Sequence, residues 1–473
     1  MSDPEAFLAA AQALLGPRGL SRDPELVEPW LSDWRGRFHG RALALAAPAD
    51  TAEVAALVAL CAEHRVAIVP QGGNSGMSGG ATPDASGAQL LLSLRRMNTI
   101  RAIDPAARQA TCEAGVILET LHHAAEAQGL RFPLSLGGKG SATVGGLVST
   151  NAGGTQVLRH GSMRALVLGL EAVLPDGRVL DQLTPLKKDN RGFDLKQLLI
   201  GSEGTLGIIT AATLRLLPAL ADRAVRWAGV GDVGDAPKLL AHAEKVAGDA
   251  LEGFEVMPGP CLATVVAFLP GARPPLTGAH AWHALIELDA DRAGAEGLAT
   301  RAEGLLAEAF ERQLVEDAAI AQNEAQAEAF WSLRESIAPA ERAAGPAVQH
   351  DVSVPLRSVP DFVDAATAAV ESRWPGARAV AFGHLGDGNV HFHVIAPPGT
   401  DGPAWQEGDG KAISRFVHDL VAQWRGSISA EHGIGQLKRD ELRRLGDPVA
   451  LALMGKVKHA LDPLGIMNPG KLL

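Results

Sequence analysis

The chain has 473 residues and a mass of 49.2 kDa, which is too long for one ordinary domain and predicts roughly three units. Hydrophobic residues make up 47% and charged residues 21%, a composition that buries a sizeable core and excludes a disordered chain. The 43 Lys and Arg against 54 Asp and Glu give a net charge of −11, which argues against nucleic acid or an anionic membrane as a partner. Three cysteines without a CxxC pair argue against a disulfide scaffold or an iron–sulfur cluster, and indicate a reducing compartment.

The N-terminal segment carries early acids and lacks the basic start and small-residue cleavage site of a signal peptide. No apolar run approaches the ~20 residues that a membrane helix needs. We therefore expect a cytoplasmic or matrix-type protein without a membrane span.

In chain order, apolar spacing predicts a helix over 4–16, a helix that begins at Asp50-Thr51, and short strands at 66–70 and 89–94. The segment VLGLEAVLPDGRVL has apolar runs on both sides of a DG turn, which predicts a hairpin. From about residue 219 the alanine-rich helical stretches 236–249, 292–312 and 323–345 alternate with apolar runs, which predicts a separate α+β domain. Strands and glycine turns follow from Val380, and then a helix at 409–424.

Glycines are concentrated where predicted strands end. Five of them fall in nine residues, Gly72 to Gly80, and a second cluster spans Gly137 to Gly154. Glycine lets backbone N–H groups converge on an anion without interference from a Cβ atom, although one such loop is equally well a flexible surface loop. No G-x-G-x-x-G follows a strand, and no G-x-x-x-x-G-K-[ST] occurs. The residues alone therefore predict a phosphorylated, extended cofactor held by loops of another type.

Three segments resemble the FAD-binding half of the vanillyl-alcohol oxidase/p-cresol methylhydroxylase superfamily: PQGGNSG at 70–76, the block 133–161, and GSEGTLGIIT at 201–210. The longer segment 186–210 is similar to the branch of D-2-hydroxyglutarate and D-lactate dehydrogenases. The resemblance implies α+β architecture with a two-part FAD-binding domain, an α+β substrate (cap) domain and a C-terminal segment that returns to the flavin. The implied boundaries are 1–40 (N-terminal helical segment), 41–219 (FAD domain), 220–440 (cap domain with metal site) and 441–473 (C-terminal segment).

By the same resemblance, FAD is non-covalent, because residues 70–80 contain no histidine to carry it. The pyrophosphate would lie against Pro70, Gln71, Gly72, Gly73, Asn74, Ser75, Gly76, Met77 and Ser78. The isoalloxazine and phosphate arm would be lined by Leu136, Gly137, Gly140, Ser141, Gly145, Gly146, Asn151 and Gly154. The adenosine end would be held by Glu203, Gly204, Gly207 and Ile209, and Asn468 would return to the flavin.

A histidine cluster forms a second, independent feature. His384, His391 and His393 lie within ten residues, and Glu431-His432 follow in a short turn. Alternation along a strand places His391 and His393 on one face. Two imidazoles and a carboxylate are a common set of ligands for Zn²⁺, Fe²⁺ or Mn²⁺, although histidines also line cofactor pockets without metal.

GHLGDGNVH and AEHG match the metal-binding segments of the same branch. The resemblance implies His384, His391 and Glu431 as ligands of a divalent metal, with zinc as the first choice, and His393 as a bystander. It also implies Asn389 beside the substrate and His432 as the catalytic base, whose ordinary pKa near 6.5 suits that role.

From sequence alone, a helix-surface salt bridge to Glu335 or Glu341 is the better explanation of Arg334, but FWSLRESI matches the substrate-arginine segment of the branch, and this resemblance implies a substrate role. Members commonly have Thr four residues after this Arg and Lys fifteen after it, where this chain has Ala338 and Gln349. These departures weaken the expectation of a dicarboxylate substrate, and His350 is a candidate to compensate.

We therefore expect an FAD- and metal-dependent dehydrogenase that oxidises a D-2-hydroxy acid to the 2-oxo acid, with D-2-hydroxyglutarate as the leading substrate. D-lactate, D-malate or glycolate are alternatives within the branch. A metal-dependent hydrolase, or a flavin-binding subunit without its own turnover, are alternatives of other classes. An external electron acceptor is required, with electron-transfer flavoprotein or a quinone as candidates, and a homodimer is possible.

Overall fold

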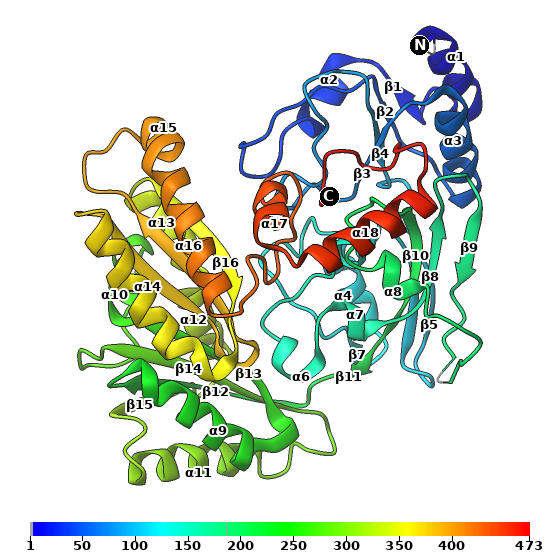
Figure 1. Cartoon of the computed structure of the whole chain (residues 1–473). Coiled ribbons are helices and arrows are strands. Elements are labelled where there is room, and N and C mark those ends of the chain that lie inside the picture. Colours follow the sequence, from blue (N-terminus) through cyan, green and yellow to red (C-terminus); the bar gives the residue numbers. More distant parts are fainter. Residues whose placement is uncertain (1–2, 187) are drawn as a thin grey trace. The chain divides into compact units, whose positions relative to one another are not determined.

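The computed structural model describes residues 3–186 and 188–473, and these form two compact units (Figure 1). Of the described residues, unit 1 comprises 3–154, 160–186, 188–219 and 431–473, and unit 2 comprises 155–159 and 220–430. The chain thus leaves unit 1 near residue 219 and re-enters it at Glu431. No described helix combines the length and apolar character that crossing a bilayer requires.

Unit 1 contains a four-stranded sheet in the order β1-β2-β4-β3, a five-stranded antiparallel sheet in the order β5-β6-β10-β8-β9, and the pair β11-β7. The strands are β1 (Leu20–Ser21), β2 (Ala44–Ala46), β3 (Ile68–Gln71), β4 (Leu90–Ser93), β5 (Ile100–Asp104), β6 (Gln109–Glu113), β7 (Leu130–Arg131), β8 (Val167–Val173), β9 (Val179–Gln182), β10 (Ile208–Arg215) and β11 (Leu217–Pro218). The predicted hairpin is confirmed, since β8 and β9 pair antiparallel from Val173↔Val179 to Leu170↔Gln182.

The helices of unit 1 are α1 (Pro4–Leu15), α2 (Pro24–Val27), α3 (Thr51–His64), α4 (Leu118–Glu126), α5 (Val144–Thr150), α7 (Met163–Leu166), α8 (Lys196–Leu199), α17 (Arg439–Leu445) and α18 (Pro448–Leu461), while α6 (Val157–His160) begins in the 155–159 segment of unit 2. The side chain of Asp50 caps α3 by accepting the Glu53 N–H at 2.8 Å, and the Glu53 carboxylate accepts the Ala49 N–H in return. Helix α3 buries its apolar face in a core cluster with both larger sheets and with Ile466 and Met467. The end of the chain is therefore part of the core of unit 1.

Unit 2 is built on a seven-stranded sheet in the order β15-β12-β14-β13-β17-β18-β16, in which every pair is antiparallel. Its strands are β12 (Asp222–Val230), β13 (Leu251–Pro258), β14 (Trp282–Ala290), β15 (Asp317–Ile320), β16 (Ala347–Ser353), β17 (Arg378–His384) and β18 (Asn389–Ile395). Its helices are α9 (Ala236–Ala247), α10 (Gly259–Phe268), α11 (Leu298–Glu311), α12 (Glu324–Glu335), α13 (Ile337–Ala344), α14 (Val359–Arg373), α15 (Gly402–Trp405) and α16 (Lys411–Gln423).

Helices cover both faces of this sheet. One face packs in an apolar cluster with α10, α12 and α13, in which Trp227 and Phe382 are buried. The other face meets α14 and α16, where the Phe362 and Phe392 rings lie 6.1 Å apart. Because side chains alternate along a strand, each side chain of β16, β17 and β18 faces one of the two layers of helices.

Candidate active site

The register of β13, β17, β18 and β16 places a row of polar side chains on one face of the unit 2 sheet. Glu255 is paired with His384, Phe382 with His391, and Asp351 also with His391. The tight turn between β17 and β18 requires Gly388, which has φ +75°, and a Cβ there would lie 2.3 Å from the Val354 carbonyl oxygen. The turn brings His384 back beside His391, since the two rings are 5.4 Å apart.

Glu255 is fully buried and its carboxylate contacts two cationic or ionisable groups at once. One oxygen accepts from Arg334 Nε at 2.7 Å, and the other contacts His384 Nδ1. Burial by itself would raise the pKa of Glu255, but Arg334 and His384 outweigh it and hold that pKa well below its usual range. The Arg334 guanidinium also lies over the Phe382 ring, with Cζ 5.1 Å from the ring centroid.

The sequence alternative for Arg334, a salt bridge to Glu335 or Glu341, is wrong. Arg334 is buried rather than on the helix surface, and its partner is Glu255 on β13, seventy-nine residues away. The sequence offered no periodicity that connects these two positions.

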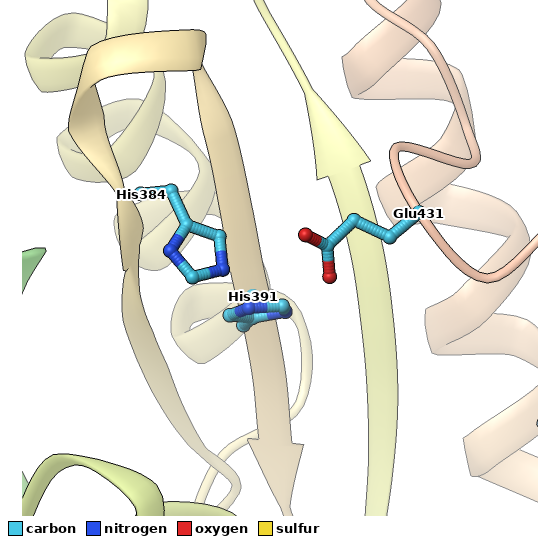
Figure 2. A group of neighbouring side chains, drawn as sticks. All are labelled: His384, His391 and Glu431. Atoms are coloured by element: carbon cyan, nitrogen blue, oxygen red, sulfur yellow. The ribbon is translucent and has the colours of Figure 1, made fainter. Parts of the chain in front are cut away.

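Three neighbouring side chains could hold a divalent cation. His384, His391 and Glu431 each offer a ligand atom, and these atoms all lie within 4.8 Å of one another. In Figure 2 the Glu431 carboxylate points toward the two imidazoles, which come from β17 and β18. Glu431 directly follows Ala430, whose N–H donates to the Asp351 carbonyl oxygen at 3.3 Å. This hydrogen bond attaches the backbone just before Glu431 to β16.

The chemistry of this donor set fits a divalent cation. Burial, together with the charges of His384 and Arg334, lowers the pKa of His391 well below its ordinary value, so the ring is neutral, which is the form that binds metal. His384 contacts Glu255 through Nδ1, the carboxylate–histidine arrangement that typically orients a ligating imidazole. The residues present therefore fit such an ion.

Asn389 begins β18 on the same face as His391. Its Nδ2 donates to Asp351 Oδ1 and to the Val352 carbonyl oxygen, both at 2.9 Å. Within the described ranges its buried Oδ1 has no hydrogen-bond partner, so one acceptor remains available.

Two neighbouring histidines have other partners. His393 contacts the buried carboxylate of Glu341 through Nδ1, and it is not part of the group in Figure 2. The expectation that His350 compensates for the missing lysine is wrong, because His350 is paired with Phe392 and points to the opposite sheet face. There its Nδ1 donates to the Phe392 carbonyl oxygen at 2.8 Å and its Nε2 lies 3.0 Å from Ser414 Oγ.

Unit 1 contains a pocket whose walls are the glycine-rich segments. Among the predicted cofactor residues, the lining includes Pro70, Gln71, Gly72, Gly73, Asn74, Ser75, Gly76, Ser78, Gly145, Gly146, Glu203, Gly204, Gly207 and Ile209. His432 lines the same pocket. The first and third glycine segments thus line one pocket together with residues between 142 and 150 of the second.

Two observations fit a polar, extended cofactor in this pocket. Thr143 Oγ1 and Gln71 Oε1 are buried, and neither has a hydrogen-bond partner within residues 3–186 and 188–473. Both residues line the pocket, so a ligand there would meet two unsatisfied polar atoms. The walls also approach each other closely, since a Cβ at Gly73 would lie 1.6 Å from the Ser141 carbonyl oxygen.

Other predicted cofactor residues lie outside the pocket lining: Met77, Leu136, Gly137, Gly140, Ser141, Asn151, Gly154 and Asn468. Several of them support the walls. Asn151 ends α5 in the left-handed conformation, and its Oδ1 accepts from Ser162 Oγ and from the Arg164 N–H. Asn468 Nδ2 donates to the carbonyl oxygens of Gly80 and Glu203 at 2.9 and 2.7 Å.

Glu203 ties the returning C-terminal segment to the pocket. Its carboxylate accepts the N–H groups of Ile434 and Gly435, both at 2.7 Å, and burial raises its pKa. Ser78 Oγ donates to the carbonyl oxygens of His432 and Gly433 at 3.0 and 3.2 Å. These bonds position the backbone of His432 at the pocket wall.

Sequence reasoning missed Thr143, Glu255 and Asp351, and it considered Glu341 only as a salt-bridge partner of Arg334 instead of His393. Thr143 lies inside the glycine block, and its neighbours were predicted to line the cofactor. The three acids lie on a strand or helix with no motif around them, so only their partners in the folded chain reveal them.

A glycine substitution tests which predicted segment contacts the cofactor. Gly73→Ala should strongly reduce the bound flavin that the resemblance implies, because its methyl group has no room beside Ser141. Gly137→Ala should retain flavin, since nothing lies within 4 Å of a Cβ there. Flavin released per mole of folded protein is the measurement. Equal flavin content in the two variants would contradict the pocket described above.

Comparison with known proteins agrees with this description. Residues 42–182 match the FAD binding domain model, and residues 220–472 match the model of the C-terminal domain of FAD linked oxidases. Solved structures of p-cresol methylhydroxylase and alkyldihydroxyacetonephosphate synthase share the fold, with TM-scores of 0.76 and 0.75 at 16% and 17% identity. Each alignment covers 99% of this chain, and 96% and 86% of those chains.

Three relatives are named D-2-hydroxyglutarate dehydrogenase. The Bos taurus protein is 38% identical over 99% of this chain and 84% of its own length. The Arabidopsis thaliana protein is 37% identical over 97% and 80%, and the Xanthomonas citri pv. viticola protein is 37% identical over 100% and 97%. The chain therefore belongs to the FAD-linked oxidases, in the branch of the FAD-dependent D-2-hydroxy-acid dehydrogenases.

Proposed function

We propose that this dehydrogenase oxidises D-2-hydroxyglutarate to the 2-oxo acid, with non-covalent FAD in the unit 1 pocket. We further propose a divalent cation, Zn²⁺ as first choice, on His384, His391 and Glu431. When bound, the flavin accepts a hydride and the cation lowers the pKa of a hydroxyl that it contacts. The names of the relatives support the substrate, and the donor set supports the cation.

The observation that carries this proposal is a chain adjacency. Glu431 belongs to the candidate metal group, and the next residue, His432, lines the candidate flavin pocket. One peptide bond separates them, and consecutive Cα atoms are about 3.8 Å apart. A small hydroxy acid would then reach both a cation and a flavin.

Residues of the chain would transfer the hydroxyl proton and bind the substrate. His432 would take the hydroxyl proton at a ring nitrogen, because imidazole is the most common general base in enzymes. Arg334, which Glu255 and Phe382 hold in a buried position, would bind a substrate carboxylate with its remaining N–H groups. Asn389 would direct its unsatisfied Oδ1 to the substrate hydroxyl.

The position of Gln349 indicates that the substrate carries a second polar group. It is paired with His393 across β16 and β18, which puts its side chain on the same face as His391. Its Nε2 is buried and has no hydrogen-bond partner in the part of the chain that the structure describes. A distal carboxylate would satisfy this donor, which favours a dicarboxylate over D-lactate or glycolate; D-malate stays an alternative.

The metal hydrolase alternative loses its support, because both matched family models are flavin-enzyme domains. Where the electrons go next stays a proposal: an external acceptor, with electron-transfer flavoprotein or a quinone as candidates. A cytoplasmic location and a homodimer also stay proposals. The animal and plant relatives are named mitochondrial, while the name of the Xanthomonas relative carries no compartment.

The purified protein should be yellow and should contain one divalent metal per chain. Anaerobic addition of D-2-hydroxyglutarate should bleach the flavin, and removal of the metal with a chelator should abolish bleaching without releasing the flavin. Visible spectroscopy with elemental analysis measures both. A colourless protein, or bleaching that survives complete metal removal, would refute the proposal.

Replacing His432 by Ala should reduce kcat by roughly 10²–10⁴-fold, the contribution typical of a positioned general base. Flavin and metal contents should stay at wild-type levels, because alanine keeps the backbone carbonyl oxygen that accepts from Ser78 Oγ. Steady-state kinetics with flavin and metal analysis tests this. Turnover within a few-fold of wild type would remove His432 from the role of base.

Gln349→Leu removes the amide donor while keeping a side chain of similar size. A hydrogen bond to a charged group contributes about 1.5–3 kcal/mol, so kcat/KM for D-2-hydroxyglutarate should fall roughly ten- to hundredfold. The value for D-lactate, which lacks the distal carboxylate, should change much less. Gln349→Lys is the matched variant and should retain dicarboxylate activity. Equal losses with both acids would show that Gln349 does not contact the distal group.

A further inference from the structure

The buried carboxylate of Glu255 is not proposed to touch the substrate, the flavin or the cation, yet it contacts two residues that are. Arg334 Nε donates to Oε2 at 2.7 Å, and His384 Nδ1 contacts Oε1. Glu255 lies on β13, Arg334 on α12 and His384 at the end of β17, so three separate elements of unit 2 meet at one carboxylate. Glu255 is fully buried, and the two partners are each at least nine-tenths buried.

A carboxylate is the side chain that can make both contacts together. Its two oxygens both accept, whereas an amide presents one acceptor and one donor. With a glutamine at this position, either the Arg334 Nε–H or the His384 Nδ1–H would face an NH₂ group. Burial of all three groups makes such a mismatch costly, because water cannot replace the lost partner.

The contact also decides which ring nitrogen of His384 would ligate a cation. Nδ1 contacts Glu255, so that nitrogen is Nε2. On the other side, the Arg334 Nε is occupied by Glu255, and the terminal nitrogens of its guanidinium are left for a carboxylate. One residue thus sets the orientation of both groups.

We propose that Glu255 is a positioning residue that couples the metal ligand His384 to the carboxylate-binding Arg334. Cation binding orders His384 against Glu255, and Glu255 holds Arg334 in the conformation that receives the substrate carboxylate. This inference rests on the proposed function. It predicts that a change at Glu255 alters metal affinity and substrate KM together.

The same sheet face supplies a matched control. Glu341, on α13, is also buried and contacts the Nδ1 of a histidine, His393. It differs in two respects: its second oxygen lies 4.0 Å from Cys261 Sγ instead of an arginine, and His393 is outside the group in Figure 2. Glu341→Gln therefore removes a buried carboxylate–histidine contact of the same kind without touching a candidate ligand.

The experiment compares wild type, Glu255→Gln, Glu255→Asp and Glu341→Gln as full-length, flavin-loaded proteins. Metal is removed with a chelator, and Zn²⁺ affinity is measured by competition with a chromogenic chelator, which needs no turnover. Kinetics with D-2-hydroxyglutarate then separate KM from kcat, and thermal unfolding reports stability.

We expect Glu255→Gln to weaken Zn²⁺ binding roughly 10–100-fold, the range typical for residues that orient a ligating histidine, and to raise KM. Glu255→Asp keeps both accepting oxygens but withdraws them by one methylene, so it should show a smaller defect in the same two quantities. Glu341→Gln should keep Zn²⁺ affinity within about twofold of wild type, even where it lowers the unfolding temperature comparably.

Two results would overturn the inference alone. The first is that the wild type binds Zn²⁺ and that Glu255→Gln folds and has the same Zn²⁺ affinity and the same KM as the wild type. The second is an equal loss of Zn²⁺ affinity in Glu255→Gln and Glu341→Gln, which would make Glu255 one more buried carboxylate. If Glu255→Gln does not fold, Glu255→Asp decides by the same criteria. A wild type that binds no divalent cation would instead overturn the proposed function, and the inference with it.

Discussion

The antiparallel register of β13, β17, β18 and β16 is the constraint on which the candidate metal group depends. Cross-strand partners in such a sheet share a face, and the pairs Glu255↔His384, Phe382↔His391 and Gln349↔His393 all lie on the face covered by α10, α12 and α13. A slip of one residue in any pair would turn these side chains to the opposite helical layer. His350, one residue from Gln349, lies there and contacts Ser414.

Burying so many ionisable groups on one face is tolerated because each has a partner. Glu255 contacts Arg334 and His384, and Glu341 contacts His393. An unpaired charge in this position would cost several kcal/mol, so the pairs are interdependent. The same low-dielectric surroundings keep His391 neutral and strengthen any contact that a substrate carboxylate makes with Arg334. Stability and ligand binding therefore depend on the same contacts.

In unit 1, main-chain atoms rather than side chains form most of the pocket walls. Segments meet at distances that admit no Cβ atom, as at Gly73 against Ser141. Hydrogen bonds from side chains to backbone then fix the C-terminal segment against these loops: Glu203 accepts from 434 and 435, and Asn468 donates to Gly80 and Glu203. The result is a pocket whose shape is set mainly by main-chain atoms, which suits a long, polar cofactor.

The sequence by itself determined the features that are local. Glycine clusters after strands, the alternation that puts His391 and His393 on one face, and the DG hairpin follow from the conformational preferences of short segments, and the motif resemblance pointed to the family. Six of the eight residues predicted in the second glycine block lie outside the pocket lining, because spacing along a loop does not tell which residues face inward: Leu136, Gly137, Gly140, Ser141, Asn151 and Gly154.

Only the tertiary structure decided the partners. Arg334 and Glu255 are seventy-nine residues apart, and His384 and Glu255 one hundred and twenty-nine, and no periodicity relates such positions. Their contact results from strand order and register, which depend on how two helical layers bury the whole sheet. For the same reason the sequence could suggest His350 as a substitute for the missing lysine, while the fold turned that residue to the other face and left Gln349 facing His391.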